Sequence, residues 1–109
     1  MNKHAMDVDT AETLAGVVRL LRQAAVLAWA AADRAQARSP RQLFALGVDL
    51  AADLAGHLVP DGTEIDGPVP VGDEPAGLLR STELLLRRVA PIARWDALDD
   101  LRATVADLV

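Results

Sequence analysis

Three side chains able to bind metal or transfer protons recur at four-residue spacing in the middle of the chain. Asp49, Asp53 and His57 would follow one edge of a helix, because residues four apart are neighbours on a helix surface. A histidine and a carboxylate in this register could supply two ligands to a metal ion. The other histidine, His4, lies near the N-terminus, and the chain has no cysteine. Since two ligands on one helix do not complete a site, we expect a solvated edge and no bound metal.

A second group of acidic side chains lies between Val59 and Ala76, in the segment VPDGTEIDGPVPVGDEPA. A calcium-binding EF-hand loop that began at Asp61 would need Asp or Asn at its third and fifth positions and Gly at its sixth. Thr63, Ile65 and Asp66 occupy these positions, so the pattern does not predict a calcium site. A connection this long in a compact domain is usually functional or disordered. We expect a solvated acidic loop, and the alternative is a docking strip for a basic partner, formed by Asp61, Glu64, Asp66, Asp73 and Glu74.

The residue patterns of nucleophilic enzymes are missing from the sequence. Ser39 precedes a proline and is explained as a helix cap, and Ser81 falls on a predicted helix face. Neither serine has a histidine at the spacing of a known triad, and no glycine-rich phosphate-binding loop is present. We therefore predict no catalytic residue, no cofactor and no enzymatic activity.

The composition indicates a single helical domain. The 109 residues are 51% apolar, with one Phe, no Tyr and a net charge of −5. Apolar residues that are mostly Ala and Leu favour a helical core. An acidic balance argues against a nucleic-acid partner, and arginines mixed with acids argue against a membrane-surface helix. Because the first residues lack the apolar region of a signal peptide, we expect a cytoplasmic protein.

The longest apolar run, Leu14–Ala35, is the element that the others must cover. Asp9 and Glu12 form a capping-box pair ahead of it, so we predict a helix from Thr10 to Arg38. Its apolar arc is wider than the roughly 100° stripe of a surface helix, which indicates burial against several neighbours. The residues at helical spacing are Leu14, Val17, Val18, Leu21, Ala25, Ala28, Ala32 and Ala35.

A second helix is predicted from Pro40 to Leu58. Ser39 is a suitable N-cap, and proline is favoured at the first helical position. Gly47 and Ala51 would allow close approach to the alanine face of the first helix. We expect the stripe of this helix to consist of Leu43, Leu46, Leu50 and Leu54.

A third helix is predicted to begin at Pro75 and to be interrupted near Pro91. Its first apolar stripe consists of Leu78, Leu79, Thr82, Leu85, Leu86 and Val89. The stripe beyond the proline consists of Trp95, Leu98, Leu101, Val105 and Leu108. In one straight helix the two stripes would lie more than a quarter-turn apart. The chain must therefore kink or restart there, with Asp96 as a possible cap.

Together these elements predict an all-α fold, a small helical bundle of three long helices of which the third is broken near Pro91, so that four helices result. Residues 1–8 are predicted to form a flexible N-terminal tail. Residues 9–109 are predicted to form a single helical domain with an acidic Pro/Gly-rich loop at 59–74.

The predicted function is that of a small soluble helical protein–protein interaction or structural module that self-associates as a homodimer. A first helix of about 29 residues would be roughly 43 Å long, which exceeds the width of a compact chain of this size and leaves apolar surface uncovered. The residues we expect at an interface are Val26, Trp29, Trp95, Leu98 and Leu101. For the two tryptophans, filling space in the core is the favoured interpretation, and contact with a partner is the alternative.

A regulatory or secreted helical adaptor is the alternative function. It would use the loop at 59–74 to dock a partner with a basic surface. An enzyme or a metal-binding protein is the third hypothesis and has the least support in the sequence.

Overall fold

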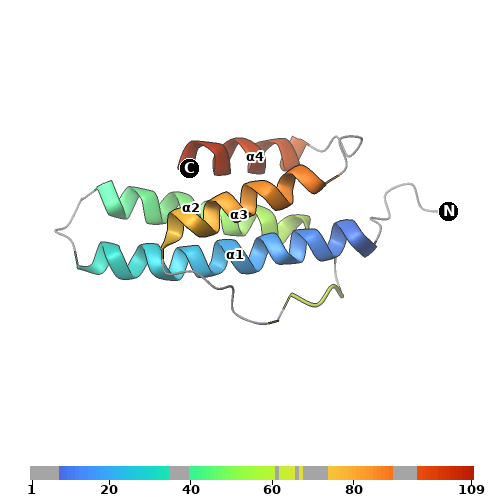
Figure 1. The fold of residues 1–109 in the computed structure, drawn as a ribbon, viewed down its shortest axis with the longest axis horizontal. Coiled ribbons are helices and arrows are strands. Elements are labelled where there is room, and N and C mark those ends of the chain that lie inside the picture. The colour runs from blue at the N-terminus through green and yellow to red at the C-terminus, as the bar shows by residue number, and fades with distance from the viewer. Residues whose placement is uncertain (1–7, 35–39, 61, 66, 68–73, 90–95) are drawn as a thin grey trace.

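The protein is a bundle of four helices in the computed structural model, which describes residues 8–34, 40–60, 62–65, 67, 74–89 and 96–109 (Figure 1). The helices are α1 (Val8–Asp33), α2 (Pro40–Leu58), α3 (Pro75–Arg88) and α4 (Asp96–Leu108). No strand occurs among these residues. The all-α prediction is confirmed, and so is the restart of the chain as a fourth helix beyond Pro91.

The long connection between α2 and α3 follows from the way the helices are arranged. α1 packs against α2 and α3, and α4 packs against the same two helices, so α1 and α4 are diagonal partners. Neighbouring helices run antiparallel, which makes the diagonal pair α2 and α3 parallel (Figure 1). The chain must therefore return along the bundle before α3 can begin, as in four-helix bundles with a crossover connection. Residues 59–74 connect the two parallel helices, which accounts for the length of the connection.

The apolar face of α1 forms the centre of the core. All the described members of its predicted stripe are buried, and Ala15 and Ala24 are buried beside them. The helix begins at Val8, before the predicted start, so Asp9 lies in its first turn. It ends at Asp33 instead of Arg38, and residues 35–39 and 1–7 lie outside the described part. Residues Asp9–Asp33 are long and apolar enough to cross a membrane, although the core helix of a soluble protein has the same length and hydropathy.

The predicted stripe of α2 is wrong for three of its four leucines. The predicted bounds of the helix are correct, and Leu54 packs, partly buried, against the core. Leu43, Leu46 and Leu50 are 72%, 53% and 55% exposed. The small residues on the other side of the helix pack against the core. This buried face consists of Ala45, Val48, Ala51 and Ala55.

Two features of the packing explain why these leucines stay outside. Small side chains on both α1 and α2 allow the two helices to pack closely through their alanine faces. α4 has 13 residues and α2 has 19, so at 1.5 Å per residue α4 is about 9 Å shorter. The end of α4 lies at Gly47, where an added Cβ would come within 2.8 Å of Leu108 Cδ2. The bundle measures 53 × 27 × 21 Å, and the α1–α2 pair projects beyond α3 and α4 at one end (Figure 1).

The described part of the loop at 59–74 is less solvated than predicted. Val59 is buried, and Ile65 packs, partly buried, against the main core. Arg19 Nη1 of α1 donates a hydrogen bond to the carbonyl oxygen of Ile65 over 3.1 Å. Gly62 turns the chain with φ +85°, a conformation that other residues rarely adopt. The hydrogen bond from Arg19 thus attaches the loop to α1 at Ile65.

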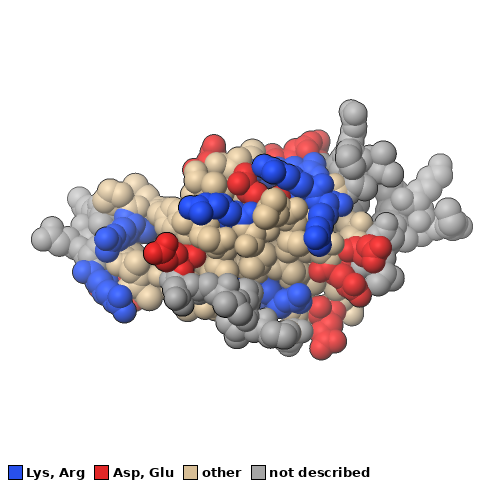
Figure 2. Space-filling model, in the orientation of Figure 1, with Lys and Arg blue, Asp and Glu red and all other residues tan. Residues whose placement is uncertain are grey.

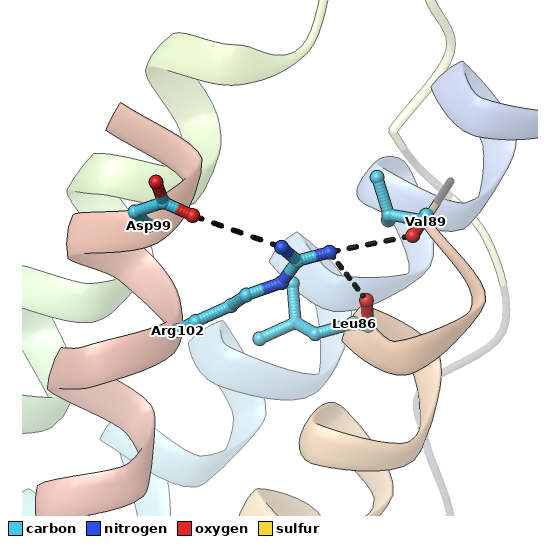
Figure 3. A network of polar contacts seen from close by, with 4 residues as sticks. All are labelled: Leu86, Val89, Asp99 and Arg102. Carbon is cyan, nitrogen blue, oxygen red and sulfur yellow. Dashed lines mark hydrogen bonds and ion pairs between the residues drawn. The ribbon is translucent and has the colours of Figure 1, made fainter. Parts of the chain in front are cut away.

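Arg102 of α4 joins the last two helices (Figure 3). Its Nη2 donates to the carbonyl oxygens of Leu86 and Val89, both at 3.3 Å, and its Nη1 lies 3.8 Å from Asp99 Oδ1. Carbonyls in the last turn of a helix have no partner within the helix. A cation at this end also favours the helix dipole. Arg102 therefore closes the C-terminal end of α3 and fixes α4 against it.

We predict that Arg102→Ala lowers the free energy of unfolding by about 1 kcal/mol, because two carbonyl oxygens lose a charged donor that is itself partly exposed. Arg80→Ala, on the exposed side of α3, is the matched control and should change it by less than about 0.5 kcal/mol. Urea unfolding followed by circular dichroism measures both values. Equal losses in the two variants would contradict this role of Arg102.

Candidate functional site

Three of the six large apolar residues that are exposed in the described part of the chain lie on α2. Leu43, Leu46 and Leu50 are three and four residues apart, so they follow one another along a single helix face, which we call the leucine face. The other large exposed apolar residues are scattered, since Val26 lies on α1, Leu84 on α3 and Val109 just beyond the end of α4. Contiguous apolar surface on a folded protein marks an interaction site more often than scattered residues do.

The projecting end of the α1–α2 pair has a small core of its own. Ala28 and Ala32 of α1 are buried against Ala45 of α2. Trp29 and Phe44 are partly buried beside them. Trp29 also ties the helices together, because its indole Nε1 donates a hydrogen bond of 2.9 Å to Asp49 Oδ2. The leucine face is therefore displayed on a two-helix support that α3 and α4 do not cover completely.

A groove of about 820 Å³ lies between α1 and α2. Its apolar lining consists of Ala25, Val26, Trp29, Ala30, Ala52 and Gly56. Its polar lining consists of Arg22, Asp33, Asp49, Asp53 and His57. The edge formed by Asp49, Asp53 and His57 in the sequence is thus one wall of this groove.

The groove carries an excess of negative charge. Three aspartates line it, and Arg22 is the only arginine or lysine among the lining residues that the structure describes. None of the three carboxylates forms an ion pair with a described residue, whereas Arg102 and Asp99 do so elsewhere. His57 Nδ1 donates to the carbonyl oxygen of Asp53 over 2.7 Å, since a carbonyl can only accept. In the described part of the chain, no three potential metal ligands are grouped together.

The structure separates the residues predicted to contact a partner. Val26 is 61% exposed and lies with Trp29 in the groove. Leu98 and Leu101 are fully buried in the main core, so they have no surface to offer a partner and that part of the prediction is corrected. The stripe of α4 faces inward because α4 packs against both α2 and α3. Among the predicted loop residues, Glu64 and Glu74 are exposed. Trp95, Asp61, Asp66 and Asp73 lie outside the described residues.

The sequence reasoning missed the leucine face because it assigned those leucines to the core. A signal for the correct orientation was present. The small residues of α2 recur at three- and four-residue spacing as the leucines do, and α1 offers an alanine-rich face for them to meet.

Comparison with protein-family models, with curated proteins and with solved structures found no match to this chain. The leucine face and the adjoining groove are therefore the observations on which a functional proposal can rest.

We predict that His57→Ala changes the free energy of unfolding by less than about 0.5 kcal/mol, as ordinary surface substitutions do, because the imidazole is exposed. Adding a chelator should leave the thermal midpoint of the wild type unchanged, since the side chains of this edge do not group as metal ligands. Differential scanning fluorimetry with and without EDTA measures the second effect. A midpoint that falls with EDTA in the wild type but not in His57→Ala would reveal a metal site.

Proposed function

We propose that this chain is a small helical protein–protein interaction module that self-associates as a homodimer through the leucine face of α2. The observation that carries the proposal is the row of three leucines, each more than half exposed, on one side of a helix. Burial of such side chains is the main favourable term in most protein association. A symmetric dimer lets each copy cover the leucines of the other.

The proposed dimer has two-fold symmetry. In such an interface the same surface of both copies meets itself, and the residue at the middle of the patch lies near the axis. Leu46 is the middle residue of the leucine face, so two α2 helices would cross close to it. A stable interface needs about 800 Å² from each partner, which is more than three leucines supply. Val109 follows Leu108, whose side chain lies against Gly47, so the end of α4 borders the leucine face and can extend the contact.

The adaptor alternative, in which the loop at 59–74 docks a basic partner, has weaker support. The parallel orientation of α2 and α3 already accounts for the length of the loop. Val59 of the loop is buried in the core and Ile65 packs, partly buried, against it, so a partner could reach only part of their surface. Glu64 and Glu74 are its exposed described acids.

We predict that Leu46→Glu converts the dimer to a folded monomer, because two carboxylates would face each other near the two-fold axis without water or a cation. Sedimentation equilibrium at micromolar concentration should give twice the chain mass of 11.6 kDa for the wild type and the single mass for the variant. Leu84→Glu is the matched control. It introduces the same charge at an equally exposed leucine on α3 and should remain dimeric.

Circular dichroism establishes that both variants retain the helical fold. A wild type that sediments as one species near 11.6 kDa, and does not change on concentration, would refute the dimer. A dimer that Leu46→Glu leaves intact would place the interface away from the leucine face.

A further inference from the structure

We propose that the groove between α1 and α2 binds a basic amphipathic helix of a partner protein. The site is distinct from the self-association proposed above and does not depend on it. Grooves between two helices commonly accept a third helix, which places apolar anchors in the groove and polar residues at its edges. The shape, the lining and the charge of this groove each fit that occupant.

The shape of the groove accommodates a helix of about three turns. Along α1 its lining extends from Arg22 to Asp33, which at 1.5 Å per residue corresponds to about 16 Å. Small residues, among them Ala30, Ala52 and Gly56, lie between its walls and leave room for the apolar side chains of a partner. The space above Gly56 is open, since an added Cβ there would meet no atom within 4 Å.

The charge of the groove selects a cationic occupant. Among the described lining residues, Arg22 is the one arginine or lysine beside Asp33, Asp49 and Asp53, and no described lysine or arginine forms an ion pair with the three carboxylates. The basic side chains of α3 are exposed on that helix, where Figure 2 shows them gathered on the face in view. A lysine or arginine of a partner would therefore meet carboxylates that form no ion pair within the described part of this chain. Such complementarity determines partner choice and the association rate.

Trp29 lines the groove beside Asp49. Its hydrogen bond to Asp49 holds the indole and the carboxylate next to each other. The methylene stem of a lysine or arginine can pack along an indole while its charged end reaches a carboxylate, and a cation over the indole face gains further attraction. This pairing of an aromatic surface with carboxylates favours a long basic side chain over a simple inorganic cation.

The test is a fluorescence titration with a designed peptide. The probe is an acetylated helical peptide of about 14 residues, with leucines at i, i+3, i+7 and i+10 and lysines at most other positions. The control peptide replaces each lysine by glutamate. The protein carries Trp95→Phe, so that Trp29 is the only tryptophan. It also carries Leu46→Glu, so that binding is measured without self-association.

We expect the lysine peptide to change the emission of Trp29 with a saturable, micromolar dissociation constant, and the glutamate peptide to leave it unchanged. Asp49→Asn with Asp53→Asn should weaken binding at least tenfold. Asp100→Asn with Asp107→Asn is the matched control, which removes the same charge from exposed positions of α4, and should weaken it less than twofold. Raising the salt concentration from 50 to 200 mM should weaken peptide binding to the protein that keeps Asp49 and Asp53. The same change should weaken peptide binding less in the variant with Asn at both positions.

Three results would overturn the proposal. Equal weakening by the two Asn pairs would show an effect of net charge alone. Equal binding of the glutamate peptide would exclude charge selection. Spermidine binding as tightly as the peptide would identify a small cation as the occupant.

The Asn variants are designed to keep the fold. Asparagine at position 49 keeps an oxygen that can accept the hydrogen bond from the Trp29 indole, and an unchanged circular dichroism spectrum confirms folding. If the double Asn variant fails to fold, Asp53→Asn alone tests the same loss of binding. Failure of the dimer appears in sedimentation and failure of the groove in this titration, so the two are distinguishable.

Discussion

The contact between the alanine-rich faces of α1 and α2 is the interaction on which the rest of the structure depends. Because Ala28, Ala32 and Ala45 are small, the two helices can approach closely through these faces. That approach decides which side of α2 is buried, and so leaves its leucines on the outside. It also makes α1 and α2 the two walls of a groove whose polar residues would otherwise lie on separate surfaces.

The second constraint is the unequal length of the helices. α1 has 26 residues, whereas α3 and α4 have 14 and 13, so the second pair covers only part of the first. Two contacts stabilise the covered part. Arg102 binds the end of α3, and the carbonyl oxygen of Ile65 binds Arg19 of α1. The projecting end carries the small core of Ala28, Ala32 and Ala45. The candidate groove extends from Asp33 near this end to His57 in the last turn of α2.

The helices could be predicted from the sequence, but the choice of buried face could not. Pro40 and Pro75 each sit at the first helical residue, and Asp96 begins α4, so local chemistry located these starts. Periodicity predicted the leucine stripe of α2, whereas the small residues at similar spacing on its other side form the buried face. Leucine is the more hydrophobic residue, yet close packing of alanines prevailed. Leu101 was predicted at an interface but is buried, because α4 packs against α2 and α3 and this tertiary contact cannot be read from the local sequence. The groove required the α1–α2 pairing, which no local signal specifies.

The small separate core at the projecting end has a consequence for the dynamics of the molecule. Local opening of a protein costs less free energy where fewer apolar groups are buried. Three alanines with Trp29 and Phe44 form this end, whereas the main core contains the large buried leucines and valines of all four helices. Backbone amides near Ala45 should accordingly exchange with deuterium through a local fluctuation, and those near Leu79 only through global unfolding. A partner bound at this end would reduce the local opening and so slow amide exchange near Ala45.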